Sequence, residues 1–394
     1  MKKFIAIVMV AMFALSMVAC SQPAAEETPA TEETPATEET AAPEASAEAA
    51  SEYKVAMITD YGDITDQSFN QTTYEACKAF CEEKGIDFNY FKPAGDSDAE
   101  RVAMIESSID EGYNVVVMPG YAFAGAIKET AGTYSDVTFI ALDVGAADLG
   151  DDYQLPSNLY CAVYQEELCG YMAGYAAVKL GYKNLGFLGG MAVPAVVRYG
   201  YGFVQGVDAA AAALGLTDVK LNYVYGGQFY GDSDITAVMD TWYTNGTEVV
   251  FACGGGIYTS AVEAALKNNG YVIGVDVDQN YIGANGVADG TYAYNPFITS
   301  AMKGLSEAVS TSLSDIEAGE WSTIAATNGN FGLEDGDYVG LPTAEDSWNF
   351  ETFTVEEYEA LKQKIASGEI VVDNSSDDAT KPTVSEFTNV TYIQ

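Results

Sequence analysis

From residue 53 onward, short apolar runs alternate with longer segments whose apolar residues recur at helical spacing. The runs are apolar almost throughout, as in strands that are buried on both faces. Strands of this kind, each followed by a helix, are typical of parallel sheets covered by helices. The first array is predicted to contain strands at Tyr53–Thr59, Phe88–Phe91, Asn114–Met118, Val137–Leu142 and Leu159–Tyr164, with helices near Ser68–Lys84, Asp98–Gly112 and Tyr121–Tyr134.

The same alternation begins again after Tyr164. Its strands are predicted at Leu185–Leu188, Lys220–Tyr225, Val249–Ala252 and Tyr271–Val275, with helices near Arg198–Leu214, Ile235–Thr244, Tyr258–Asn269 and Ile298–Leu313. Two such arrays in 394 residues predict an α/β chain of two lobes, each a doubly wound, mostly parallel sheet. We expect residues 53–162 plus 292–325 to form the first lobe and residues 163–291 plus 326–394 the second.

The first 52 residues have a different pattern. Two lysines, an apolar run from Phe4 to about Met17 and small residues before Cys20 are typical of a secretory signal peptide. Leu15-Ser16-Met17-Val18-Ala19-Cys20 resembles a bacterial lipobox, so we predict a signal peptide over residues 1–19 and a lipid anchor on Cys20. The alternative is a plain secretory signal with an incidental cysteine. Residues 20–52 carry nine glutamates and a Thr-Pro-Ala-Thr-Glu-Glu repeat with no aliphatic residue larger than alanine. Such a segment buries too little surface to fold and is predicted to be a disordered tether.

Composition excludes several classes of function. The formal net charge of −41 argues against binding to nucleic acid or to anionic lipid surfaces. The chain contains no histidine, which removes the commonest general base and most zinc sites, so we expect no catalytic residue, metal or cofactor. Five cysteines follow Cys20, and none forms a C-x-x-C pair. A disulfide between Cys77 and Cys81 is conceivable, but free buried thiols are the favoured interpretation.

Candidate ligand-binding residues lie where the predicted strands end. In open parallel sheets, ligands bind beyond the carboxyl ends of the strands. Asp60, Asp143 and Asp276 each stand at such an end, and another strand runs into Gly254-Gly255-Gly256. Each aspartate is alternatively a helix cap or turn residue. Carboxylates that meet in one cleft suit the hydroxyl groups of a sugar.

Two aromatic residues extend this candidate site. Phe69 is predicted in the first helical turn after the first strand, where backbone N–H groups lack helical partners. Ser68 and Gln71 have the spacing of a capping box. Phe229 lies in a glycine-rich turn of the second array. If Phe69 and Phe229 face each other across the cleft, they can sandwich a planar base; otherwise each is a core residue.

Four segments of the chain follow one known pattern. They are Thr59-Asp60-x-Gly62-x-x-x-Asp66-x-Ser68-Phe69-Asn70-Gln71, Tyr201-Gly202-Phe203-x-x-Gly206, Gly274-Val275-Asp276-x-Asp278-Gln279 and Thr299-Ser300-Ala301-Met302-Lys303. Through these segments the chain resembles the basic membrane protein family, lipoprotein receptors of ABC importers that include purine-nucleoside receptors. The resemblance covers Tyr53 to about Val372, and residues 283–294 depart from the family pattern as an insertion.

The resemblance implies a type I periplasmic-binding-protein fold with three crossovers between the lobes. It also implies that Cys20 carries a lipid anchor on the extracytoplasmic face of the cell membrane. The ligand would be a neutral nucleoside, delivered to an ABC permease by what we expect to be a monomer. The family's contacts to the base fall on Asp60, Ser68, Phe69 and Asn70. Its contacts to the ribose fall on Asp276, Lys303 and a glycine near Gly254. Asp143 matches a further binding aspartate of the family, and Phe229 matches the second stacking ring.

Other interpretations of the sequence stay open. Gly200-Tyr-Gly202-Phe-Val-Gln-Gly206 approaches a dinucleotide-binding fingerprint but misses its spacing, which disfavours an enzyme with a nucleotide cofactor. The same fold also suits a receptor for a sugar, an autoinducer or another small metabolite, because aromatic rings stack on sugars too. A surface adhesin or a signalling protein would use this fold without transport. Without a cluster of Lys and Arg or a P-loop, a neutral nucleoside is favoured over a nucleotide.

Overall fold

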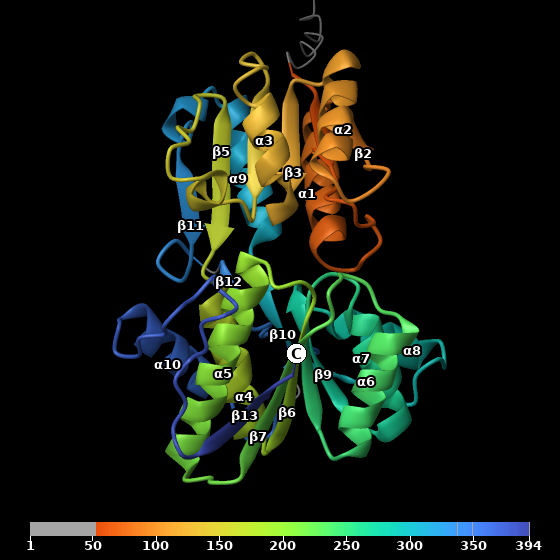
Figure 1. The fold of residues 1–394 in the computed structure, drawn as a ribbon, viewed down its shortest axis with the longest axis vertical. Helices are drawn as coiled ribbons and strands as arrows, with labels where there is room; N and C mark the ends of the chain where they lie inside the picture. The colour runs from red at the N-terminus through yellow and green to blue at the C-terminus, as the bar shows by residue number, and fades with distance from the viewer. Residues whose placement is uncertain (1–52, 337, 349, 394) are drawn as a thin grey trace, which may run out of the picture. The chain divides into compact units, whose positions relative to one another are not determined.

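The computed structural model describes residues 53–336, 338–348 and 350–393. The predicted signal peptide, Cys20 and the tether lie outside the described residues. The described residues form two β-sheets with helices on their faces (Figure 1). In this part of the chain, no helix combines the length and apolar character that crossing a membrane requires.

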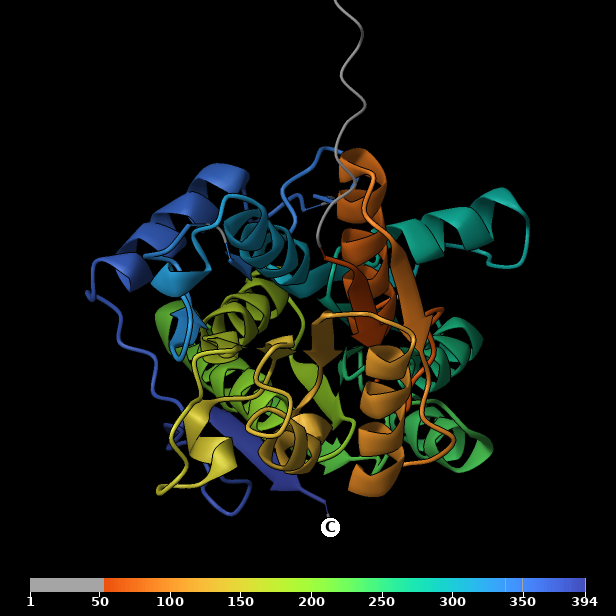
Figure 2. The ribbon, with the colours of Figure 1, turned by 90° about the horizontal axis from the view of Figure 1, so that it is seen from above.

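The first sheet has strand order β2-β1-β3-β4-β5-β11, and its pairings are all parallel. Its strands are β1 (Val55–Ile58), β2 (Phe88–Phe91), β3 (Val115–Pro119), β4 (Thr138–Leu142), β5 (Leu159–Tyr164) and β11 (Asn328–Phe331). Its helices are α1 (Phe69–Lys84), α2 (Asp98–Asp110), α3 (Ala124–Thr130) and α9 (Leu305–Glu317), with short 3-10 helices at Tyr121–Phe123, Ala146–Leu149 and Trp321–Thr323. Helices α1 and α9 lie side by side (Figure 2).

Alternating residues of β1 show why this sheet is buried on both faces. Val55 and Met57 pack into the core that contains Cys77 of α1, whereas Ala56 and Ile58 pack into the core that contains Ile127 of α3. Because successive side chains of a strand point to opposite faces, an uninterrupted apolar strand requires a helical layer on each side.

The second sheet has strand order β12-β10-β9-β8-β6-β7-β13, and only the short β12 is antiparallel to its neighbour among the described strands. Its strands are β6 (Asn184–Gly189), β7 (Val219–Tyr225), β8 (Val249–Cys253), β9 (Tyr271–Asp276), β10 (Phe297–Lys303), β12 (Val339–Gly340) and β13 (Thr388–Tyr392). Its helices are α4 (Glu166–Lys179), α5 (Pro194–Leu214), α6 (Ser233–Thr244), α7 (Tyr258–Asn268), α8 (Asn280–Ala288) and α10 (Val355–Ala366).

Both sheets repeat one topology. Strands β1–β5 in the first and β6–β10 in the second follow the same spatial order, second-first-third-fourth-fifth. The chain passes between the sheets after β5, after β10 and after β11. The predicted two-lobed α/β fold with three crossovers is therefore confirmed.

Two strands differ from the predicted lobe boundaries. Residues 297–303, predicted as the start of a helix in the first lobe, form β10 and pair with β9 of the second sheet. All seven are buried or partly buried, which suits a central strand better than an amphipathic helix. Strand β11, expected in the second lobe, pairs with β5 of the first sheet. Helices α4 and α8 were not predicted from the sequence.

Helices α4 and α5 pack closely because four glycines line their contact. A Cβ at Gly202 of α5 would lie 1.9 Å from the carbonyl oxygen of Glu167, and one at Gly174 of α4 would lie 2.3 Å from that of Phe203. Gly170 and Gly206 show the same closeness to the facing backbone. The Gly202–Gly206 motif thus serves helix packing and not a phosphate-binding loop.

The five cysteines after Cys20 are buried and free in the structure. The favoured interpretation of free thiols is therefore confirmed, and the conceivable disulfide between Cys77 and Cys81 does not form. Burial raises the pKa of the Cys77 thiol well above its ordinary value, which makes it a poor nucleophile.

The close contact of α4 and α5 makes a prediction. Gly202→Ala forces a methyl group onto the backbone of α4, so we expect the free energy of unfolding to fall by about 1–3 kcal/mol, measured by urea denaturation. Gly132→Ala is the control, since a Cβ there meets nothing within 4 Å. Equal stability of the two variants would contradict this account of the helix contact.

Candidate functional site

A cavity of about 930 Å³ lies where loops from the carboxyl ends of both sheets meet. Residues at the carboxyl ends of β1, β2, β3 and β4 line one side, and residues at the carboxyl ends of β6, β7, β8, β9 and β10 line the other. The structure brings eight of the predicted site residues to this cavity: Asp60, Phe69, Asn70, Asp143, Phe229, Gly254, Asp276 and Lys303. Ser68 does not line it.

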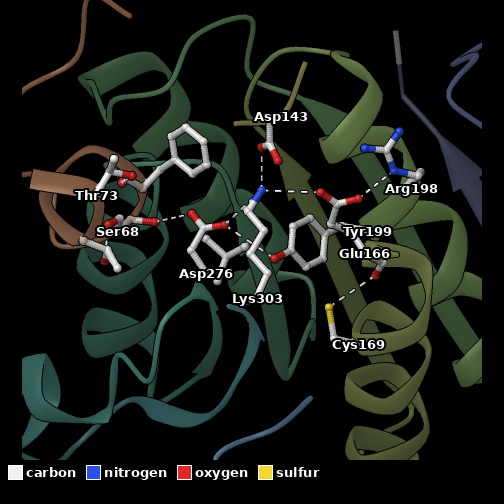
Figure 3. A network of polar contacts seen from close by, with 12 residues as sticks. Ser68, Thr73, Asp143, Glu166, Cys169, Arg198, Tyr199, Asp276 and Lys303 are labelled. Carbon is white, nitrogen blue, oxygen red and sulfur yellow. Dashed lines mark hydrogen bonds and ion pairs between the residues drawn. The ribbon is translucent and has the colours of Figure 1, made fainter. Parts of the chain in front are cut away.

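Lys303, the last residue of β10, lies among three carboxylates (Figure 3). Its Nζ is 2.5 Å from an Oδ of Asp143, 3.4 Å from an Oε of Glu166 and 3.7 Å from an Oδ of Asp276. The side chain is only 2% exposed. Because Asp143 follows a strand of the first sheet and Lys303 ends a strand of the second, this ion pair joins the two sheets at the cavity.

Aromatic rings complete the surroundings of the ammonium group. Nζ of Lys303 lies 4.7 Å from the ring centroid of Phe69, 5.4 Å from that of Tyr164 and 5.6 Å from that of Tyr199. Ring faces attract a cation, most strongly where water is excluded. Phe69 is therefore held by the buried cation on one side while its ring contributes to the cavity wall.

Charge explains why this lysine stays protonated in the interior. Burial by itself lowers the pKa of Lys303, but the carboxylates of Asp143, Asp276 and Glu166 together raise it above the ordinary value. Burial raises the pKa of Asp276, and the neighbouring Lys303 opposes that rise. The cluster therefore keeps a cation and polar oxygen atoms at the cavity wall without bulk water.

Glu166 and Arg198 are part of this cluster that the sequence analysis missed. Glu166 is fully buried and accepts a 2.6 Å hydrogen bond from Nε of Arg198. Burial raises the pKa of Glu166, while Arg198 and Lys303 oppose the rise. The second cation reduces the excess of negative charge around Lys303. An arginine in the otherwise apolar start of α5 was the available signal for such a partner.

Asp276 is held by polar partners from both sheets. Its Oδ2 accepts a 2.5 Å hydrogen bond from the Ser68 hydroxyl, and its Oδ1 accepts a 3.4 Å bond from the Tyr199 hydroxyl (Figure 3). Ser68 precedes α1 of the first sheet, so this bond also crosses between the sheets. Within the structure Ser68 acts on the carboxylate of Asp276, and not on the cavity directly.

The predicted capping box at Ser68 is wrong. The Ser68 side chain makes no cap bond at the start of α1, because its hydroxyl is directed to Asp276. Asp66 takes its place and accepts hydrogen bonds from the backbone N–H groups of Ser68, Asn70 and Gln71. Asp66 also accepts from the side-chain amide of Asn70. The motif aspartate therefore orders the first turn of α1 and orients Asn70.

Asp60 follows β1 and is 8% exposed. One carboxylate oxygen accepts 2.7 Å bonds from the backbone N–H groups of Tyr61 and Gly62. Its backbone carbonyl accepts a 3.1 Å bond from Nε of Arg101, a side chain that is 3% exposed. Burial raises the pKa of Asp60, and the two N–H groups, Asn70 and Arg101 oppose this. The carboxylate of Asp60 is thus oriented by its own loop at the wall of the cavity.

Two aspartates that line the cavity have a strained backbone. Asp143 has φ 58° and Asp276 has φ 67°, in the left-handed region that non-glycine residues seldom adopt. They occupy equivalent places, since Asp143 follows β4 and Asp276 ends β9, the fourth strands of the two arrays. Such strain concentrates at ligand sites, where a side chain must leave the strand direction.

The position of the Phe229 ring depends on two glycines that leave room for it. A Cβ at Gly190 would lie 2.2 Å from its ring, and a Cβ at Gly254 would lie 2.8 Å from it. Gly254 also has φ 139°, which disfavours any other residue. The structure therefore assigns Gly254 a packing role beneath Phe229, the residue predicted as the second stacking ring.

The polar groups of the cavity suit hydroxyl and N–H groups of a ligand better than a metal ion. Among the described residues, no group of three or more Cys, Asp and Glu side chains is arranged to hold a metal ion. The carboxylates nearest one another already surround the ammonium group of Lys303.

Comparisons with known proteins identify the family of this chain. A family model described as ABC transporter substrate-binding protein PnrA-like matches residues 53–376. The ABC transporter nucleoside-binding protein BmpA of Lactococcus lactis is 27% identical over 61% of this chain and 68% of its own length. Basic membrane protein B of Borreliella burgdorferi is 27% identical over 82% of this chain and 88% of its own length.

Solved structures share the fold. An ABC transporter solute-binding protein from Aeropyrum pernix matches with a TM-score of 0.68 and 21% identity, over 83% of this chain and 95% of its own. One from Conexibacter woesei matches with a TM-score of 0.62 and 23% identity, over 82% and 99% of the two chains.

The buried cluster makes a prediction for stability. Lys303→Met leaves three buried carboxylates without their common cation, so we expect the free energy of unfolding at pH 7 to fall by about 3–5 kcal/mol in urea denaturation. The control is Lys179→Met, since Lys179 pairs with a half-exposed Glu357 and such pairs contribute about 0–1 kcal/mol. A loss below about 1 kcal/mol for Lys303→Met would contradict the role of this ion cluster.

Asp66 makes a prediction for pH dependence. Burial raises its pKa to about 6, against the opposing hydrogen bonds at the start of α1. The folded protein then binds this proton more tightly than the unfolded chain does. Asp66 therefore contributes most to stability below about pH 4, and the contribution is lost as the pH rises to about 6.

Asp66→Asn removes this titration and keeps a side chain that caps helices well. Relative to the unsubstituted protein, the variant should gain on the order of 2 kcal/mol of unfolding free energy between pH 4 and pH 6.5, from urea denaturation at each pH. Asp136→Asn, at an exposed position, is the control and should show no such trend. A constant difference across this range would refute the assignment.

Proposed function

Because this chain belongs to the PnrA-like family of ABC transporter substrate-binding proteins, we propose that it binds a neutral purine nucleoside in the cavity for import. The family binds solutes for ABC transporters, and the chain is not an enzyme. The observation that carries the proposal is the joint presence of a buried ion cluster and two aromatic rings at one cavity.

The ribose would lie at the ion cluster. Asp143 and Asp276 present carboxylate oxygens there, and Lys303 presents a donor between them. One oxygen of Asp143 is buried and has no hydrogen-bond partner in the protein. A buried unpaired acceptor is costly, and a ligand hydroxyl would satisfy it. Hydrogen bonds to charged groups contribute about 1.5–3 kcal/mol each, which favours a ligand with several hydroxyls.

The base would lie between Phe69 and Phe229, with its polar edge toward Asp60 and Asn70. Both rings line the cavity, one from each side. Asp60 presents an acceptor, and Oδ1 of Asn70 is buried without a partner in the protein. A base edge with N–H donors suits these acceptors. The BmpA protein of Lactococcus lactis, described as nucleoside-binding, is consistent with this assignment.

Charge favours a nucleoside over a nucleotide. Lys303 and Arg198 are the cations of the inner cluster, and the carboxylates of Asp143, Glu166 and Asp276 outnumber them. A phosphate placed there would meet excess negative charge. A neutral ligand avoids that repulsion.

Ligand binding would favour contact between the two lobes. The bonds from Ser68 to Asp276 and from Lys303 to Asp143 join groups of the two sheets next to the proposed ribose site. A ligand that contacts both sides binds the closed arrangement more tightly than the open one, and this differential affinity shifts the population. The closed form would be the one that an ABC permease recognises.

The proposal also includes the first 52 residues and the assignment of elements to the two lobes. Residues 1–19 would be removed as a signal peptide, and Cys20 would carry lipid at the extracytoplasmic face of the membrane. Residues 20–52 would tether a monomeric receptor to that anchor. The lobes would be those of the two sheets, with β10 in the second and α9 and β11 in the first.

Calorimetric titration against nucleosides, free bases, nucleotides and simple sugars tests the proposal. We expect purine nucleosides to bind most tightly and their 5′-phosphates to bind at least tenfold more weakly. Phe69→Ala should weaken nucleoside binding by about 1–3 kcal/mol through lost stacking. Phe88→Ala is the control, because Phe88 is partly buried and packs against Tyr74 away from the cavity.

Preference for a sugar over every nucleoside would refute the nucleoside assignment. It would support the second candidate, a receptor for a sugar or another small metabolite on the same fold. Unchanged affinity in Phe69→Ala would assign that ring to packing alone.

A further inference from the structure

The cavity continues beyond the proposed nucleoside site, on the far side of Asp60. Asp60 touches Asn70 on one side, and on the other a Cβ at Gly120 would lie 3.5 Å from its Oδ2. Tyr61, Arg101 and Tyr121 line the cavity next to Asp60, because Tyr61 follows Asp60 in the chain, Arg101 bonds to its carbonyl, and Tyr121 follows Gly120. Tyr230 and Gly231 line the cavity from the second sheet. A cavity of about 930 Å³ is at the upper end of the range for drug-sized ligands, and a nucleoside is a small member of that class.

Three tyrosines mark this outer part of the cavity. Tyr121 is 38% exposed and Tyr230 is 56% exposed, although most large aromatic side chains of the chain are buried or partly buried. Tyr61 and Tyr230 line the same cavity from the two sheets. Burial and the acidic neighbours raise the pKa of Tyr61, and the Tyr230 phenol adds to this rise. Exposed aromatic surface next to a ligand cavity is typical of a binding subsite.

Tyr61 is held in place by a buried cation. The guanidinium of Arg101 lies 6.0 Å from the Tyr61 ring and 5.9 Å from the Phe123 ring. Arg101 also bonds to the backbone carbonyl of Asp60 and pairs with Asp96. The ring of Tyr61 therefore starts from an ordered position, which reduces the entropy lost when a ligand packs against it.

Charges in the outer part of the cavity are balanced. Its cations are Lys92, Lys128 and Arg101, and its acidic residues are Asp63, Asp96 and Asp98. Lys92 pairs with Asp63, and Arg101 pairs with Asp96 and Asp98. Because these charges balance, they attract an anionic group only weakly. The tyrosine rings instead suit a flat or apolar group.

We propose that Tyr61, Tyr121 and Tyr230 form an outer subsite that accepts an aromatic or apolar substituent on the base of a nucleoside. The inference rests on the proposed function, which places the ribose at Lys303 and the base edge at Asp60. In a purine nucleoside, the exocyclic group at C6 lies opposite the glycosidic bond. A substituent on that group therefore extends past Asp60 into the outer part of the cavity, whereas a substituent on the ribose meets the buried ion cluster.

Isothermal titration with adenosine, N6-benzyladenosine and 5′-O-benzyladenosine tests the subsite. We expect N6-benzyladenosine to bind as tightly as adenosine or up to about tenfold more tightly. The 5′-O-benzyl compound should bind at least about tenfold more weakly than adenosine, because its benzyl group is directed at the ion cluster.

Substitution of two of the tyrosines tests whether the benzyl group binds at the outer subsite. Tyr121→Ala and Tyr230→Ala should each lower the ratio of N6-benzyladenosine affinity to adenosine affinity by about three- to tenfold. Tyr90→Ala is the matched control, since Tyr90 is also 38% exposed but does not line the cavity, and it should leave the ratio unchanged.

These measurements distinguish failure of the outer subsite from failure of the proposed function. Loss of binding on N6 benzylation while adenosine still binds would overturn the outer subsite and leave the proposed function intact. The same holds if neither tyrosine variant changes the affinity ratio. If no nucleoside binds at all, the proposed function fails and the outer subsite fails with it.

Discussion

The buried ammonium group of Lys303 is the interaction on which the rest of the site depends. It lies at the end of a strand of the second sheet and pairs at 2.5 Å with Asp143, which follows a strand of the first. Alone, neither charge is stable in an apolar interior, since desolvation of a single ion costs several kcal/mol. Together with Asp276, Glu166 and Arg198 they form a cluster in which each charge has an opposite neighbour.

This cluster links stability to binding. Groups that hold the two sheets together at the cavity are the same groups that we propose contact the ribose. Ser68 supports these groups from outside the cavity lining, because its hydroxyl bonds to Asp276 instead of capping its own helix. A change in one of these residues therefore alters lobe contact and ligand contact together, which is why each test above includes a variant outside the cluster.

Repetition of one topology in both sheets explains where the site lies. Equivalent loops of the two arrays face one another, so residues at matching strand ends meet across the cavity. Asp143 and Asp276 are one such pair, and both adopt left-handed backbone. Gly120 and Gly254, after the third strands, are another, with φ of 123° and 139°. In each pair the backbone turns sharply at the strand end, which brings side chains or glycine backbone to the cavity.

The sequence by itself determined the fold class, because uninterrupted apolar strands separated by helices can only be buried in covered parallel sheets. It also determined that Asp60, Asp143 and Asp276 stand at strand ends, since this follows from local order along the chain. Only the tertiary structure decided the partners of those residues. Glu166 follows β5 by two residues and Arg198 lies on α5, but only the tertiary structure brings them to each other and to Lys303. Ser68 exchanged a local cap for a bond to a residue 208 positions away. The lobe assignments of β10 and β11 likewise depend on the strand that each one pairs with. Pairing between strands that are distant in the sequence is not encoded in the local pattern of apolar residues.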